Sequence, residues 1–260
     1  MKIKYVLACC ALFAFIWGCT GLKETKRHPP LPANVSTVEP ESVLESLEQI
    51  NRELISFKGI GKIKIWNRNG LQSTRFAWAA YRPEKLRLEI LGLAGRPLSS
   101  VAFDGRQFYL SLHAENKFYQ KQTRNANLKR LISIPISLSD TLTILAGRVP
   151  LWDNASASLA EQSHGDSNIL ILKTKWFRKQ TAKIYLRDDF HTVYQFESYG
   201  SASKLRYRVN YLKRKQYDKY QLPELLEITD DRQNRIQISV DRIWPDAEIP
   251  PETFIMKPPN

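Results

Sequence analysis

Cysteine is nearly absent from this sequence of 260 residues. Its three copies, Cys9, Cys10 and Cys19, all lie within the first twenty positions. The remainder of the chain therefore excludes an internal disulfide and a cysteine-based zinc site. The length is sufficient for one well-buried domain, and an aromatic content of 11% argues against a disordered chain.

Motifs of catalysis and cofactor binding are also missing. The four histidines, His28, His113, His164 and His191, include no pair at helical metal-binding spacing, and no HExxH or GxSxG motif occurs. The glycines of "GIG" at 59–61 lack the third glycine and the helix of a dinucleotide-binding fingerprint. They indicate instead a strand that curves, or whose backbone another group approaches. We therefore expect no enzyme, no bound metal and no cofactor.

The sequence has no long apolar run. Residues 5–18 carry no charge, but these 14 residues fall short of the ~20 that a membrane-spanning helix needs. They follow Lys2 and Lys4 and have the composition of a secretory signal segment. The run ends in Ile16-Trp17-Gly18-Cys19, which resembles the lipobox of bacterial lipoproteins, although Trp17 is larger than the usual residue there.

The lipobox resemblance implies a signal peptide at 1–18 and a lipidated Cys19 as the first residue of the mature protein. Thr20 follows the cysteine in place of an aspartate that would favour inner-membrane retention, so we expect an outer-membrane anchor with the domain facing the periplasm. Residues 19–40 are polar and proline-rich, which predicts a flexible tether. A cleaved signal without lipid and an uncleaved N-terminal anchor are the alternatives.

Hydrophobic periodicity divides residues 41–260 into one helix followed mainly by strands. Apolar residues at helical spacing predict a helix over 41–54, after which the period changes to two. Two shorter helical segments are expected at 126–132 and 137–147, the second capped by Ser137 or Ser139. The predicted fold is mainly β: a single antiparallel, incomplete (half-open) β-barrel of about eleven strands, with the N-terminal helix first and helices capping the open side.

Positive charge predominates, since 39 Lys and Arg against 26 Asp and Glu give a formal net charge of +13. The strands alternate apolar and basic residues, so the wet face of the sheet is expected to carry much of this charge. That face could meet anionic headgroups or an acidic partner, or simply keep the protein soluble. Because an exported lipoprotein rarely meets nucleic acid, we expect no nucleic-acid partner.

The order of these elements resembles the LolA/LolB superfamily of lipoprotein-localisation proteins, and the LolB-like outer-membrane lipoproteins more than LolA. The resemblance covers roughly residues 41–256. It depends on "FKGIGKIKIW" at 57–66, "LGLAGRPLSSVAFDG" at 91–105, the Leu145, Gly147 and Pro150 string, and "NRIQISVDRIW" at 234–244. It implies a monomer that binds lipoprotein acyl chains or another lipid in an apolar cavity, receives clients from a soluble LolA-type carrier, and inserts them into the outer membrane.

Alternation along the strands supplies the candidate residues of that cavity. Those on the sheet are Ile63, Ile65, Phe76, Trp78, Leu88, Ile90, Val101 and Phe103, and those on the helical lid are Leu142 and Leu145. The resemblance places a membrane-touching loop at "LGLAGRP", with Leu93 at its tip; the alternative is that Leu93 folds back on the core. The rival function is a non-transferring assembly or lipid-sensing lipoprotein that binds a protein partner on the same scaffold.

Overall fold

The structure, a computed structural model, describes residues 38–68, 70–123, 128–153, 155–161, 168–174 and 180–258. The predicted signal peptide, Cys19 and the tether as far as Thr37 lie outside the described residues. Within the described ranges, no helix combines the length and the apolar character required to cross a membrane.

The first described element is the helix α2, Pro40–Glu53, which confirms the helix predicted at 41–54. Proline at the first helical position is favourable because its missing N–H would have no intrahelical partner there. Val43 and Leu47, one turn apart, are buried and bind the helix to the core. The chain then turns extended at Leu54, which is fully buried.

Thirteen strands form one antiparallel sheet that does not close into a barrel, which confirms the predicted fold class. The count exceeds the expected eleven. Its two edges are β6 and β7, short strands that alternation indicates only weakly. The strands are β1 (Ser56–Asn67), β2 (Gly70–Tyr81), β3 (Lys85–Leu91), β4 (Pro97–Asp104), β5 (Gln107–Leu112), β6 (Lys117–Gln122), β7 (Ala155–Glu161), β8 (Asn168–Thr174), β9 (Gln180–Leu186), β10 (Val193–Tyr199), β11 (Leu205–Tyr217), β12 (Tyr220–Thr229) and β13 (Arg235–Pro245). Short 3₁₀ helices are η1 (His113–Glu115), η2 (Ser201–Ser203) and η3 (Pro251–Phe254).

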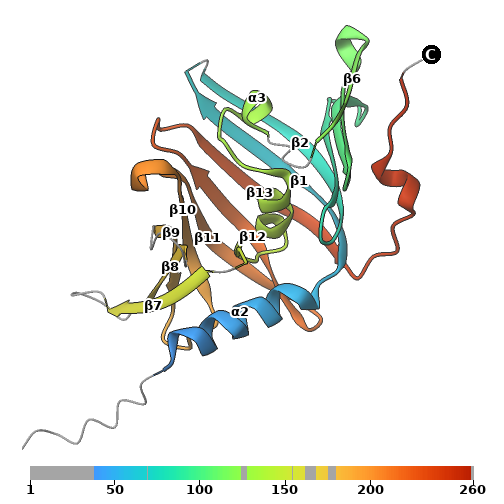
Figure 1. Cartoon of the computed structure of the whole chain (residues 1–260). Coiled ribbons are helices and arrows are strands. Elements are labelled where there is room, and N and C mark those ends of the chain that lie inside the picture. Colours follow the sequence, from blue (N-terminus) through green and yellow to red (C-terminus); the bar gives the residue numbers. More distant parts are fainter. Residues whose placement is uncertain are drawn as a thin grey trace, which may run out of the picture. The chain divides into compact units, whose positions relative to one another are not determined.

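The sheet consists of two meanders joined at one seam. Strands β1–β6 follow one another in space, as do β7–β13, and the first strand pairs with the last, β1 with β13. The chain must therefore pass from the β6 edge to the β7 edge. Residues 128–153 make part of that passage and carry α3 (Lys129–Ile132) and α4 (Leu138–Leu145). These helices lie on the concave side of the sheet, while α2 crosses one end of it (Figure 1).

Alternation correctly assigns the two faces of the sheet. On β11, Tyr207, Val209 and Tyr211 are buried, and on β13 so are Ile236, Ile238 and Val240. On the outer face Lys58 and Lys62 of β1 are exposed. The dry face of this sheet and the helical passage therefore share one continuous hydrophobic core.

The helix α4 is fixed to the sheet by one buried polar contact. Its N-cap is Ser137, whose side chain accepts a hydrogen bond from the backbone N–H of Asp140. The Tyr207 hydroxyl of β11 donates to Asp140 Oδ2 over 2.8 Å, and both residues are buried. Burial raises the pKa of Asp140, and the hydrogen bonds from Tyr207 and Ser137 act in the opposite direction.

Removing that contact should loosen α4 from the sheet. We expect Tyr207→Phe to lower the free energy of unfolding by about 1–3 kcal/mol, because a buried carboxyl group loses its donor. Urea unfolding measures the change. Tyr119→Phe on the edge strand β6, where the ring is 50% exposed, is the matched control and should change stability by under about 0.5 kcal/mol. Equal stability of the two variants would contradict the anchoring role.

Gly59 and Gly61 both allow another group to approach the backbone of β1 closely, as the sequence indicates. A Cβ atom on Gly59 would lie 2.2 Å from Cζ2 of Trp78, whose ring covers this residue. A Cβ atom on Gly61 would lie 2.3 Å from the carbonyl oxygen of Ser239 on β13. The register of β1 against β13 shifts between Ile60 and Gly61, so the strand is irregular at the seam between the two meanders.

Candidate functional site

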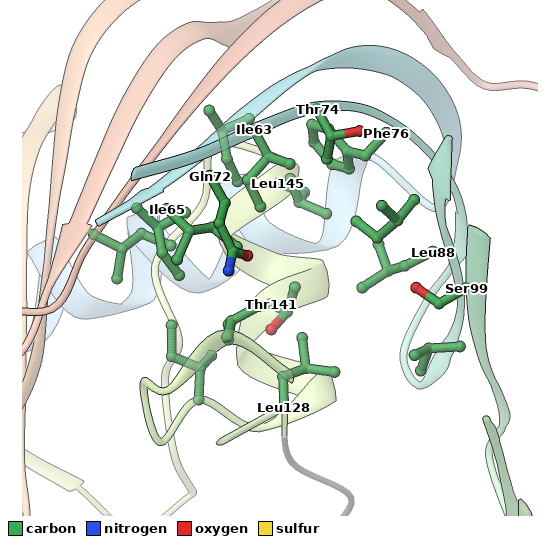
Figure 2. A pocket seen from close by; sticks show the side chains of 17 residues that line it. Ile63, Ile65, Gln72, Thr74, Phe76, Leu88, Ser99, Leu128, Thr141 and Leu145 are labelled. Carbon is green, nitrogen blue, oxygen red and sulfur yellow. The ribbon is translucent and has the colours of Figure 1, made fainter. Parts of the chain in front are cut away.

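A cavity of about 260 Å³ lies between the concave face of the sheet and the helical passage. Strands β1–β4 form one wall, β12 and β13 contribute a second, and α3, α4 and the residues beside them close the space (Figure 2). The lining residues are Ile63, Ile65, Gln72, Thr74, Phe76, Leu88, Ile90, Ser99, Val101, Leu128, Ile132, Ile136, Thr141, Leu145, Ile228, Ile236 and Ile238.

The wall of this cavity is mainly hydrocarbon. None of the described lining residues carries a charge, and only four have a polar side chain. Two of those four direct their hydroxyl to the main chain: Thr74 donates to the Leu91 carbonyl and Thr141 to the Ser137 carbonyl, each over 2.8 Å. The site therefore suits an apolar ligand that is held by burial of its surface and not by directed hydrogen bonds. Burial of apolar surface contributes about 25 cal/mol per Å² to the free energy of binding.

The size and the mouth of the cavity limit what it can hold. Its volume lies just below the ~300–1,000 Å³ of common ligand pockets. Gln72 is exposed, and Ile65 and Ile90 are partly exposed, so the cavity meets solvent beside the β1–β2 hairpin. In Figure 2 the Gln72 amide lies among the lining side chains, and Thr74, Ser99 and Thr141 supply the other polar atoms. A long chain could enter there with its polar end directed outward.

Seven of the ten candidate residues chosen from the sequence line the cavity. They are Ile63, Ile65, Phe76, Leu88, Ile90, Val101 and Leu145. The other three lie in the core beside it. Trp78 stacks on Phe76 with ring centroids 4.8 Å apart, and Phe103 and Leu142 are 5% and 1% exposed. Alternation identifies the inner face of a strand but not the position along it where packing leaves a space.

Ten lining residues are not among the candidates predicted from the sequence. Ile228, Ile236 and Ile238 belong to the last two strands, which reach the cavity because β13 pairs with β1. Leu128, Ile132 and Ile136 come from the helical passage, and Gln72, Thr74, Ser99 and Thr141 are the polar members. The alternation of Ile236 and Ile238 was visible, but nothing in the sequence showed which strand would lie beside them.

The loop between β3 and β4 presents an apolar tip. Leu93 is fully exposed and does not fold back on the core. The loop is closed by hydrogen bonds from the Gly92 N–H to the Arg96 carbonyl, 2.8 Å, and from the Gly95 N–H to the Gly92 carbonyl, 3.0 Å. Gly95 has a φ of +73°, which favours glycine. Leu98, 48% exposed, extends the apolar surface.

The described residues hold no group of three His, Cys, Asp or Glu side chains that could share a metal ion. No protein-family model matches the sequence, and no curated protein matches it.

Solved structures do match the fold. A LolA superfamily protein from Nitrosomonas europaea is 14% identical, with a TM-score of 0.60, over 84% of this chain and 98% of its own. A domain described as outer membrane lipoprotein-sorting, from Vibrio parahaemolyticus, is 9% identical, with a TM-score of 0.60, over 82% and 94%. A DUF1329 family protein from Desulfovibrio piger is 12% identical, with a TM-score of 0.62, over 83% and 97%.

These similarities span almost the whole length of the matched chains, and identities of 9–14% make them similarities of fold. The open antiparallel sheet and the helices on its concave side agree with the architecture expected from the sequence. This chain therefore has the LolA/LolB-type fold.

Proposed function

We propose that this protein is a lipid-binding lipoprotein of the bacterial envelope that shields an acyl chain in the cavity between sheet and helical passage. The observation that carries the proposal is the uncharged lining of that cavity. Each CH₂ group moved from water into such a space gains about 0.8 kcal/mol. A cavity without a charged anchor binds many chains and distinguishes little between them, which suits a protein with several clients.

The finer proposal is that the protein receives lipoproteins from a soluble LolA-type carrier and inserts them into the outer membrane. The solved structure from Vibrio parahaemolyticus, described as outer membrane lipoprotein-sorting, supports this assignment by fold. A lipid on Cys19 would keep the protein at the membrane, where it can receive a client but not ferry one. In this proposal the protein binds and transfers as a monomer and catalyses no covalent reaction.

The binding proposal is tested by purifying the native protein in mild detergent and measuring bound lipid by mass spectrometry. We expect an acylated molecule to copurify, and we expect the mature N-terminus to be a lipidated Cys19. Depletion of the protein in its host tests transfer: acylated lipoproteins should then accumulate away from the outer membrane. Normal sorting together with lipid-free protein would reject the proposed function.

The exposed Leu93 suggests how a client is delivered. Inserting one leucine side chain into a bilayer gains about 1.5–3 kcal/mol, which corresponds to a factor of ten or more. We therefore expect Leu93→Glu to slow transfer of an acylated client into liposomes about tenfold, while acyl binding in solution is unchanged. Leu212→Glu, at a leucine 53% exposed on β11, is the control and should transfer at the normal rate. Equal transfer rates for both variants would show that the loop takes no part in delivering the client.

A second candidate function is favoured by the cavity volume. At about 260 Å³ the space falls below that of common ligand pockets, so the chain as folded accommodates only part of a long acyl group. A protein that senses lipid, or assembles with a protein partner without transferring lipid, needs no larger space. Under this alternative, depletion leaves lipoprotein sorting intact, while a protein partner crosslinks to the domain.

A further inference from the structure

A second pocket, also of about 260 Å³, lies where α2 meets the chain after α4 and the turns β9–β10 and β11–β12. It shares no lining residue with the apolar cavity. This second pocket is cationic where the first is apolar, because Arg148, Arg214 and Lys219 all line it, together with His191. We call it the cationic pocket. Glu53 is the one acidic side chain among the described lining residues.

The most buried cation that lines this pocket is Arg148, which is only 9% exposed. Its Nε–H has no hydrogen-bond partner among the described residues. The nearest carboxylate oxygen, Oε2 of Glu53, lies 3.8 Å from Nη2, and the Glu53 side chain is 49% exposed. Burial lowers the pKa of Arg148, and Arg214 and Arg82 act in the same direction, whereas Glu53 raises it.

Arg214 is held in place beside it. Its Nη1 donates to the Gly147 carbonyl over 3.1 Å and its Nη2 to the Val193 carbonyl over 2.8 Å. The guanidinium also lies 4.6 Å from the centre of the Tyr211 ring. Neutral carbonyls and a ring fix this cation without neutralising its charge. Nη1 of the neighbouring Arg82 is also buried without a partner among the described residues.

The remaining lining groups include a third cation, which adds to the excess of positive charge around the pocket. Lys219 lies at the rim with its side chain 67% exposed, and its ion pair with Asp246 is long at 3.9 Å. His191 forms a hydrogen bond of 3.0 Å between Nδ1 and Ser46 Oγ. Three cations and one carboxylate, that of the half-exposed Glu53, therefore line the same space. Burying a cation is unfavourable unless negative charge compensates it, and a bound anion would supply that charge.

We propose that this pocket binds a phosphate group, with the buried Arg148 and the half-buried Arg214 as its inner cations and the exposed Lys219 at its entrance. A phosphate group carries up to two negative charges and several acceptor oxygens, so it can accept hydrogen bonds from the cationic side chains that line the pocket and offset the excess of positive charge. The phosphate can belong to a phospholipid headgroup or be free inorganic phosphate. Both sources present unesterified phosphate oxygens to the pocket.

Titration calorimetry on the full-length protein in detergent, at constant ionic strength, tests the proposal with two probes. One is inorganic phosphate; the other is glycerophosphoglycerol, a phosphodiester headgroup without acyl chains that cannot use the apolar cavity. We expect saturable binding of at least one probe below about 10 mM, against a reference titration with chloride. Tenfold tighter binding of glycerophosphoglycerol identifies a lipid headgroup, and the reverse identifies the free ion.

Three variants connect binding to the pocket. Arg148→Gln should weaken binding at least about tenfold, equal to the loss of one charge-assisted hydrogen bond. Lys219→Gln, on a side chain that is 67% exposed, should weaken binding about threefold and decides the outcome if Arg148→Gln fails to fold. Lys62→Gln, an equal charge change at an exposed position of β1, should leave affinity unchanged. Absence of saturable binding, or equal affinity in all folded variants, would overturn the proposal.

Discussion

Replacing Leu88 with glutamate is expected to weaken binding of a fluorescent fatty acid by at least about tenfold. Leu88 lines the cavity, and Figure 2 shows its side chain directed into it. The residue is partly exposed, so a carboxylate there can stay hydrated while the cavity is empty. An entering acyl chain would remove that water from the charge, and this desolvation opposes binding by several kcal/mol. Titration with the fatty acid measures the loss directly.

Two further variants distinguish the effect of an added charge from the effect of a reduced cavity volume. Leu88→Trp adds volume without charge and should also reduce affinity, since the cavity holds only about 260 Å³. Leu212→Glu makes the same chemical change as Leu88→Glu at an exposed position of β11 and should bind normally. Circular dichroism and a melting curve verify that each variant is folded. Unaltered affinity in folded Leu88→Glu would show that the acyl chain binds elsewhere.

Replacing Gly61 with alanine is expected to produce the largest loss of stability among simple substitutions at the seam. The new Cβ would lie 2.3 Å from the Ser239 carbonyl oxygen, a main-chain atom that cannot rotate away. Strands β1 and β13 would have to separate, and this pair is the seam that joins the two meanders. We expect a loss of about 3 kcal/mol, because overpacking of a buried contact typically costs 1–3 kcal/mol and sometimes more.

A fall in melting temperature of roughly 6–12 °C corresponds to that loss for a domain of this size. Gly92→Ala is the matched control. Its Cβ would meet Cδ2 of Leu98 at 3.2 Å, the end of a flexible and exposed side chain that can move. That control should lower the melting temperature by no more than about 3 °C. If the two alanine variants have the same melting temperature, the close approach of the Ser239 carbonyl to Gly61 is not a constraint on the fold.

Short-range patterns along the chain predict the local elements and their faces. The 3.6-residue period predicted α2, the two-residue period predicted the strands, and Ser137 was among the two residues expected to cap α4. The apolar alternation of β1–β4 also placed seven residues of the cavity wall on the correct face. These features depend on neighbours within a few positions of the chain, so periodicity and capping chemistry suffice to predict them.

Where those faces leave space, and which distant residues meet there, depends on the packing of the whole fold. The pairing of β1 with β13 brings Ile236 and Ile238 into the cavity, and close packing assigns Trp78 and Phe103 to the core instead. The cationic pocket joins Arg148 and Arg214, 66 positions apart, through contacts with no periodic signature. Cavities and charge clusters are properties of three-dimensional packing, which depends on side-chain volumes from many strands at once and not on the pattern within any one of them.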